Sequence, residues 1–300
     1  MDHRTKVDWL GGRTRAEPSE VVDALRVAYG SAGQFLNTVA TGRGWMGYET
    51  MLTVRLADMP LGWLAFGGQF QRDWTHLSIT GKGCDWVQDW NTAEDALDTL
   101  KAWEPRRVDI ALDTFKGETG HDAICAAYEA GRFTTTGRKP AMQTVEHADP
   151  LSGDTVYIGK RTNEKFLRCY EKGLKEAQGE EFVAGVRAAD WYRVELELKA
   201  ADRQLPEDVI ARRDQYFAGA YPYLQTLLAD VDPALLVNLR TAGPQTDLQQ
   251  KLAACRRQYG SILFTAMHAY EGDISAVWQR IVGDRHSAEL LEAGVLLTPH

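Results

Sequence analysis

Apolar and polar positions alternate along much of the first two thirds of the chain. Short alternating runs such as Met51–Leu56 are separated by glycine and proline, and a period of two is typical of strands. Helical spacing interrupts these runs, for example over 92–103, where Thr92 is a suitable N-cap and Pro105 follows. The pattern predicts an antiparallel β-sheet with helices between its strands.

The period changes near residue 205. Strands are expected over 7–10, ending at Gly11 and Gly12, and over 62–66, 75–80, 108–115, 155–159, 165–172 and 191–199. Helices are expected near 206–229, 245–259, 273–282 and 286–293. We therefore predict an α+β protein: a domain over 1–205 with an antiparallel sheet core and flanking helices, in two β-rich halves (about 1–104 and 105–205), followed by a helical region over 206–300.

Composition narrows the class of protein. The 300 residues are 44% hydrophobic and 25% charged, which is typical of a globular protein and argues against disorder. No apolar run reaches the length of a membrane span, and the N-terminus lacks a secretory signal. The four cysteines are far apart in sequence, so we expect reduced thiols rather than a zinc site or disulfides. These features predict a cytoplasmic protein without a membrane partner.

Two predicted strands place carboxylates on their polar faces. In the strand over 191–199, the side chains of Glu195 and Glu197 point away from the apolar face, about 7 Å apart at ~3.3 Å per residue. In the strand over 108–114, Asp109 and Asp113 also share a face, although aspartate is depleted in strands. Each pattern alone also fits a solvated face; together they suggest oxygen ligands for a divalent cation.

A third strand adds a phenol and fixed positive charge. Over 165–172, Arg168, Tyr170 and Lys172 alternate onto one face with Phe166. The window 157–175 holds six basic and two acidic residues in a chain of net charge −8. A local basic patch of this kind suits phosphate, whereas the overall charge argues against non-specific coating of nucleic acid.

Brought together, these three strands would suit phosphodiester chemistry. Oxygen ligands favour Mg²⁺ or Mn²⁺ over zinc. A tyrosine with a pKa near 10 is a poor nucleophile at neutral pH, but a cation and basic side chains beside the phosphate would stabilise the charge that develops. Covalent attack by tyrosine retains the energy of the broken bond, so the strand can be rejoined.

Four motifs resemble, in order, the replication initiation factor family of rolling-circle initiators. They are VDWLGG (7–12), RRVDIALDTFKG (106–117), TVYIGKRTNEKFLRCYEKG (155–173) and WYRVELELK (191–199). The resemblance implies that Tyr170 is the nicking tyrosine and that Glu195 and Glu197 bind the metal together with Asp109 or Asp113, with the choice between the two aspartates left open. None of the seven histidines forms the His-hydrophobic-His motif of histidine-based initiators.

The resemblance also implies partners. We expect Arg168 and Lys172 to assist catalysis, and Lys160, Arg161, Lys165, Arg138 and Lys139 to contact DNA. Origin DNA, single-stranded or extruded as a hairpin, a host superfamily-one helicase and a possible second copy of the chain are the expected partners. Three alternatives stay open: a non-catalytic DNA-binding regulator, a hydrolase that uses activated water, and a conjugative relaxase of the same family.

Overall fold

A computed structural model describes residues 3–69, 71, 73–135, 137–201, 204–235 and 248–285. The chain divides into two compact units, Met1–Leu239 and Arg240–His300. The described part of the second unit consists of α8 (Leu248–Ala269) and α9 (Ile274–Ile281). Within the described residues, no helix has the length and apolar character needed to cross a membrane.

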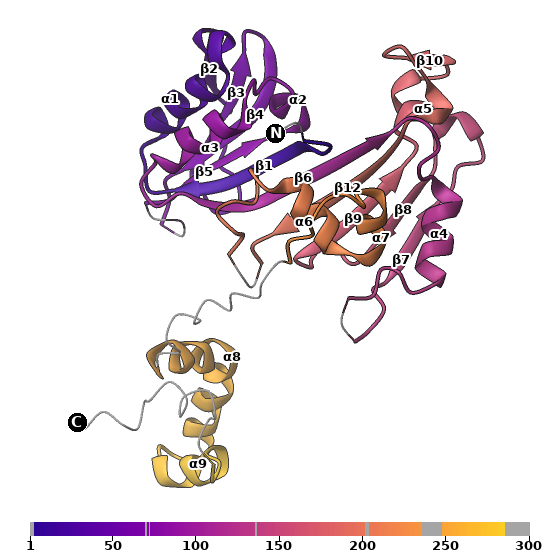
Figure 1. Cartoon of the computed structure of the whole chain (residues 1–300). Helices are drawn as coiled ribbons and strands as arrows, with labels where there is room; N and C mark the ends of the chain where they lie inside the picture. The colour runs from indigo at the N-terminus through magenta and orange to yellow at the C-terminus, as the bar shows by residue number, and fades with distance from the viewer. Residues whose placement is uncertain are drawn as a thin grey trace. The chain divides into compact units, whose positions relative to one another are not determined.

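The first unit is built on one ten-stranded sheet in the order β2-β3-β4-β5-β1-β6-β12-β9-β8-β7, with every neighbouring pair antiparallel (Figure 1). The strands are β1 (Lys6–Thr14), β2 (Leu36–Ala40), β3 (Thr50–Leu56), β4 (Met59–Phe66), β5 (Thr75–Ile79), β6 (Glu104–Thr114), β7 (Met142–Val145), β8 (Thr155–Ile158), β9 (Lys165–Tyr170) and β12 (Tyr192–Lys199). β10 (Phe182–Val183) and β11 (Val186–Arg187) form a separate hairpin.

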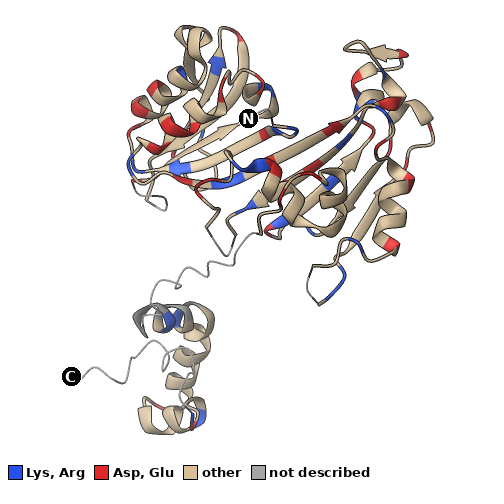
Figure 2. Cartoon of the chain, in the orientation of Figure 1, with Lys and Arg blue, Asp and Glu red and all other residues tan. Residues whose placement is uncertain are grey.

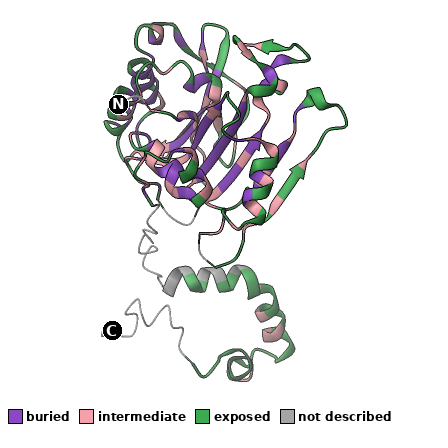
Figure 3. Ribbon diagram, turned by 45° about the vertical axis from the view of Figure 1, so that its right-hand side comes forward, coloured by how far each residue is buried: buried purple, intermediate pink, exposed green. Residues whose placement is uncertain are grey.

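Helices cover the apolar face of this sheet. They are α1 (Pro18–Ala28), α3 (Trp90–Asp98), α4 (His121–Glu129), α6 (Arg213–Ala220) and α7 (Pro222–Leu227), while α2 (Gly81–Cys84) and α5 (Lys172–Ala177) follow β5 and β9. Side chains of α1, α3, α4, α6 and α7 join Val194, Leu196 and Leu198 in one apolar core. Figure 3 shows buried residues concentrated along the central strands. Because side chains alternate along a strand, the residues between these core positions lie on the opposite face.

The two halves of the sheet repeat one connectivity. β1, α1 and β2 to β5 form the first half, and β6, α4, β7 to β9 and β12 form the second. In each half the last strand of the series lies beside the first: β5 pairs with β1, and β12 pairs with β6. β1 and β6 then pair antiparallel with each other and join the halves into a continuous sheet.

The α+β class and the antiparallel sheet with flanking helices are confirmed. The predicted boundary at residue 205 differs from the division in the structure at Leu239, because α6 and α7 contribute Phe217 and Leu224, both 0% exposed, to the core of the first unit. The helix expected over 286–293 lies outside the described residues.

Several elements begin or end elsewhere than predicted. β1 continues through Gly11 and Gly12, where a Cβ on Gly12 would lie 2.2 Å from Trp103 Cη2, so the glycine allows close packing rather than ending the strand. α3 begins at Trp90 because Asp89, not Thr92, accepts hydrogen bonds from the first turn. β2, β7 and α5 were not expected.

Candidate active site

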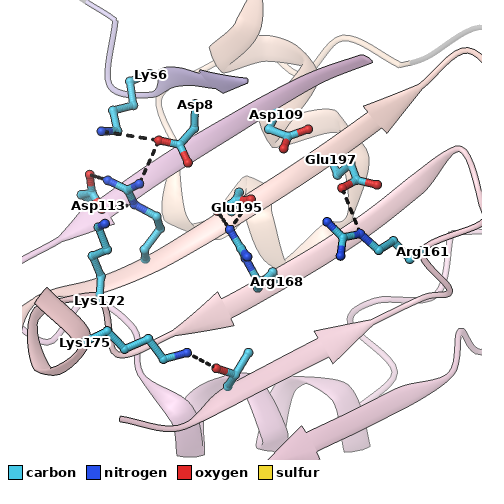
Figure 4. A network of polar contacts seen from close by, with 12 residues as sticks. Lys6, Asp8, Asp109, Asp113, Arg161, Arg168, Lys172, Lys175, Glu195 and Glu197 are labelled. Carbon is cyan, nitrogen blue, oxygen red and sulfur yellow. Dashed lines mark hydrogen bonds and ion pairs between the residues drawn. The ribbon is translucent and has the colours of Figure 1, made fainter. Parts of the chain in front are cut away.

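The four predicted carboxylates and Arg168 lie on the face of the sheet opposite the apolar core, where β6, β12 and β9 run side by side (Figure 4). The register pairs Asp109 with Glu197 across β6 and β12. It pairs Glu195 with Arg168 across β12 and β9, and Tyr170 with Arg193 one step further along. Directly opposed residues point to the same side of a sheet, so the alternation read from the sequence brings these side chains together. Figure 2 marks both acidic and basic residues along the central strands.

Asp109 and Glu197 share one arginine. Arg107 Nη2 lies 2.6 Å from Asp109 Oδ2 and 2.8 Å from Glu197 Oε2. Lys199 Nζ lies 2.6 Å from Glu197 Oε1, and Arg161 Nε lies 3.8 Å from Glu197 Oε2. Asp109 is 2% and Glu197 4% exposed, so these are buried carboxylates that need the positive charges beside them.

Asp109 ionises less readily than an ordinary aspartate. Its pKa is raised to about 7, chiefly by burial and also by the charges of Glu195 and Glu197, against the hydrogen bonds and charge of Arg107. A carboxyl with this pKa is only partly ionised at neutral pH. A further cation near Asp109 would favour its ionised form.

The donor set fits a hard divalent cation held by two carboxylates. Asp109 Oδ2 and Glu197 Oε2 both touch the same nitrogen of Arg107, so an ion placed there could bind both. Mg²⁺ commonly uses one or two carboxylates together with water and substrate phosphate. No three His, Cys, Asp or Glu side chains among the described residues lie close enough to form a metal site, so the protein offers a pair rather than a closed cage.

Glu195 is bound to Arg168 instead. Arg168 Nη2 donates to Glu195 Oε1 at 2.7 Å and to Oε2 at 2.6 Å. Its Nε is buried without a hydrogen-bond partner within the part of the chain that the structure describes. A buried donor without a partner is costly, so Arg168 Nε can still donate a hydrogen bond to an oxygen of a ligand.

Tyr170 ends β9 on the same face. It is 7% exposed and stands outside the apolar core cluster. Two cations lie against its ring: Arg168 Cζ at 5.0 Å and Lys175 Nζ at 4.8 Å from the centroid. Burial raises the pKa of Tyr170 to about 12, although Arg193 and Arg168 lower it. The hydroxyl is therefore protonated at neutral pH and needs help to become a nucleophile.

Asp113 belongs to a separate buried ion network. Both of its oxygens accept hydrogen bonds from Arg193, at 2.7 and 2.6 Å, and Oδ1 also accepts one from Trp191 Nε1 at 2.8 Å. Arg193 reaches Asp8 Oδ1 at 2.9 Å. Burial alone would raise the pKa of Asp113, but the hydrogen bonds and charge of Arg193 lower it. Of the two aspartates on β6, Asp109 is thus the one beside both glutamates.

Sequence reasoning missed three of these residues. Arg107 and Arg193 each lie two positions before a predicted carboxylate on the same strand, so the alternation places both on the face of the acids, but it assigns them no role in the site. Asp8 lies where the pairing between β1 and β6 shifts between Val7 and Trp9. No sequence signal marks that bulge, so its contact with Arg193 was not predictable.

Lys172 lies in another element than predicted, with its ammonium group near Asp113 (Figure 4). β9 ends at Tyr170 and Lys172 begins α5, so the alternation no longer places the lysine on the same face. Its Nζ pairs with Glu176 and lies 5.7 Å from the centroid of the Trp191 ring. Lys175, one turn later, is the lysine over Tyr170, and its Nζ donates to Thr155 Oγ1 at 2.6 Å.

The predicted DNA-contacting residues separate into two groups. Lys160 and Arg161 are exposed at the mouth of a cavity of about 510 Å³ that also reaches Arg168, Glu195 and Glu197. Arg138 and Lys139 are exposed in the loop after α4, where Lys139 Nζ lies 3.4 Å from Glu129.

Lys165 does not join this site. Its side chain turns toward α6 and α7, where Nζ donates to the carbonyl of Ala220 at 2.9 Å and lies 4.6 Å from the Tyr221 ring centroid. Its neighbour in the strand, Phe166, faces the cavity, and adjacent residues point to opposite faces. The Lys165 ammonium therefore lies on the face of α6 and α7, away from this cavity, and its contact with DNA stays a prediction.

Comparison with known proteins agrees with this fold and with the family resemblance. The sequence model of the replication initiation factor family matches residues 105–282, and the chain belongs to that family. The solved structure of the rolling circle replication initiator protein from Geobacillus stearothermophilus shares the fold with a TM-score of 0.51 at 20% identity, over 70% of this chain and 83% of that one. No curated protein matches the chain.

Proposed function

We propose that this chain starts rolling-circle replication by nicking, and later rejoining, one DNA strand at an origin through a covalent bond to Tyr170. The observation that carries the proposal is the placement of Tyr170, Arg168 and the carboxylates on one face of three neighbouring strands. Family membership supports the role in replication. Strand transfer by a conjugative relaxase would use the same chemistry.

In the forward step the Tyr170 oxygen attacks the scissile phosphorus, and the bond from phosphorus to the 3′ oxygen breaks. The products are a 5′-phosphotyrosyl link and a 3′-hydroxyl; the proton lost by the phenol balances the proton gained by the leaving oxygen. The reverse step rejoins the strand. Because the energy of the phosphodiester is retained in the protein link, no nucleotide cofactor is required.

The basic residues around the phenol serve this step. Arg168 and Lys175 lie against the Tyr170 ring, where positive charge stabilises phenolate and the charge on the phosphate oxygens. Asp109 and Glu197 would hold Mg²⁺ or Mn²⁺, with Glu195 joining if Arg168 turns to the DNA. When bound, such an ion would withdraw electron density from the scissile phosphate.

The substrate we propose is single-stranded DNA or an extruded hairpin, because Tyr170 sits on a sheet face and is 7% exposed. A polymerase would extend the 3′-hydroxyl while a host superfamily-one helicase unwinds the duplex. Apolar side chains of the second unit, such as Phe264 and Trp278, are 67% and 59% exposed and support a role of α8 and α9 in binding a second copy or another protein.

A covalent-trapping assay tests the proposal. Labelled single-stranded 60-mers tiled across the replicon that encodes the chain are incubated with the protein and Mn²⁺. One oligonucleotide should give a heat-stable protein–DNA band that maps to the peptide containing Tyr170. Tyr170→Phe should abolish the band, while Tyr259→Phe, in α8, should keep it. A band that persists in Tyr170→Phe would assign the nucleophile elsewhere.

The pairing of Glu195 and Glu197 with arginines favours one second candidate, a DNA-binding regulator that does not cut. Such a protein would bind the same oligonucleotide with strong salt dependence and give no covalent band with either cation. A hydrolase that uses activated water would nick the DNA and also leave no band. The trapping assay with product analysis separates the three.

A further inference from the structure

The 510 Å³ cavity beside the carboxylates extends beyond the candidate active site. It extends away from Tyr170, from β12 and β9 across β8 to β7, and the turn after β8 closes one end. Its volume lies in the range of sites for small organic ligands. Neither the attacking phenol nor the cation pair requires this space.

Two stacked rings form one wall of the cavity. Tyr157 and Phe166 lie with centroids 5.6 Å apart and an interplanar angle of 17°. Phe166 is 9% exposed, while Tyr157 is half-buried. Phe166 therefore supports the ring of Tyr157 from behind, and Tyr157 presents the surface on which a further flat ring could stack.

Donors for an anionic or polar ligand lie around these rings. Arg161 and Lys160 are exposed at the rim, and Gln143 stands opposite Tyr157 across β7 and β8. On the other side, Tyr157 is opposite Arg168, whose buried Nε lacks a hydrogen-bond partner among the described residues. The acids at the floor, Glu195 and Glu197, already contact positive side chains.

We propose that this cavity binds one unstacked nucleobase of single-stranded DNA, next to the scissile phosphate, with the base on Tyr157 and its phosphate near Arg161 and Lys160. The proposal rests on the proposed function in one respect, because that function identifies the neighbouring phosphate as the scissile one. The cavity begins two residues along β9 from Tyr170, about 7 Å at ~3.4 Å per residue. This position, the flat aromatic wall and the basic rim together fit a nucleotide better than a purely apolar ligand.

A binding experiment without catalysis tests the site. In a Tyr170→Phe background, which prevents a covalent link, fluorescein-labelled (dT)20 is titrated by anisotropy, and the same oligonucleotide with one central 2-aminopurine reports stacking. Tyr157→Leu keeps apolar volume but removes the aromatic face, and should weaken binding about tenfold. It should also remove the stacking-dependent quenching of 2-aminopurine, whereas Tyr157→Phe should keep both.

The matched control is Phe182→Leu, an aromatic residue on the β10 hairpin that is 60% exposed and outside the cavity; it should bind as the background protein does. Equal binding by Tyr157→Leu and the background, or loss in Phe182→Leu as well, would overturn the base site. If the trapping assay gives no adduct but Tyr157→Leu still loses affinity, the nicking proposal fails and the base site stands. If the adduct forms and Tyr157→Leu binds normally, only the base site fails.

Discussion

The two halves of the sheet share their connectivity but differ in what they carry on the face opposite the helices. In the first half that face is lined by rings. Trp9 and Trp63 lie 5.4 Å apart, Trp45 and Trp63 5.7 Å, and Trp45 and His76 5.0 Å, as measured between centroids. In the second half the same face carries the Asp109, Glu195 and Glu197 carboxylates with their arginines.

The difference shows that topology alone does not determine the chemistry of a sheet surface. Both halves offer strands in the same order, and the pleat offers the same alternate positions. Rings that pack edge to face fill their half with apolar contacts, while buried ion pairs in the other half hold charge in place at an energetic cost. We therefore interpret the first half as support and the second as the chemical site.

The largest expected effect is a loss of folding stability, at the most buried ion pairs of the second half. Arg193 is 2% exposed and pairs with Asp8 and Asp113. Arg193→Met should lower the free energy of unfolding by about 3–5 kcal/mol, because two carboxylates lose their partner. Urea denaturation at pH 7 measures this. Arg13→Met, which removes a more exposed pair between Arg13 of β1 and Glu104 of β6, should cost about 1 kcal/mol or less; an equal loss in both variants would contradict this ranking by burial.

The next effect belongs to the ring-lined half and depends on pH. Burial lowers the pKa of His76 to about 4, so the unfolded chain binds more protons than the folded chain between pH 6.5 and 4. Stability should fall as the pH drops through that window, by up to about 3 kcal/mol from this residue. Urea denaturation at pH 7 and pH 4.5 should show a smaller loss in His76→Gln than in the parent. An identical loss would show that His76 is not the group responsible.

A smaller effect, on Mn²⁺ binding, is expected when Arg107 is replaced. Arg107 occupies the position between Asp109 and Glu197, so it competes with a divalent cation. Arg107→Gln should tighten Mn²⁺ binding to the DNA-free protein about tenfold, or 1.4 kcal/mol, measured by electron paramagnetic resonance of unbound Mn²⁺. Arg13→Gln is the matched control in the first half and should leave Mn²⁺ binding unchanged. Unchanged or weaker binding in Arg107→Gln would count against the cation pair.

The smallest effect concerns the outer basic residues of the second half. Arg161→Gln should lower the salt dependence of binding to (dT)20 by about one counterion, because one phosphate contact is lost. Lys165→Gln should leave the slope unchanged, since its ammonium faces α6 and α7. Anisotropy titrations over a range of NaCl concentrations distinguish the two. A reduced slope in Lys165→Gln would place DNA on the helical face.

The sequence was most informative where one rule governs the local structure. Alternation over 191–199 and 108–114 placed Glu195, Glu197 and Asp109 on one side, and the structure agrees. It failed for Lys172, because nothing in the pattern marks the end of β9 at Tyr170. The role expected for Lys165 rested on its charge alone, which does not predict that its long stem packs beside Tyr221.

The seam between the halves has a mechanical consequence. β1 and β6 are joined by backbone pairing from Lys6 opposite Ala111 to Arg13 opposite Glu104, so no linker separates the ring-lined half from the charged one. A hinge motion that separates the two halves would require breaking all the backbone hydrogen bonds between β1 and β6. Adjustment to a bound strand must therefore come from local movements, such as side chains changing rotamer and turns shifting at the sheet edge, on a platform that stays rigid.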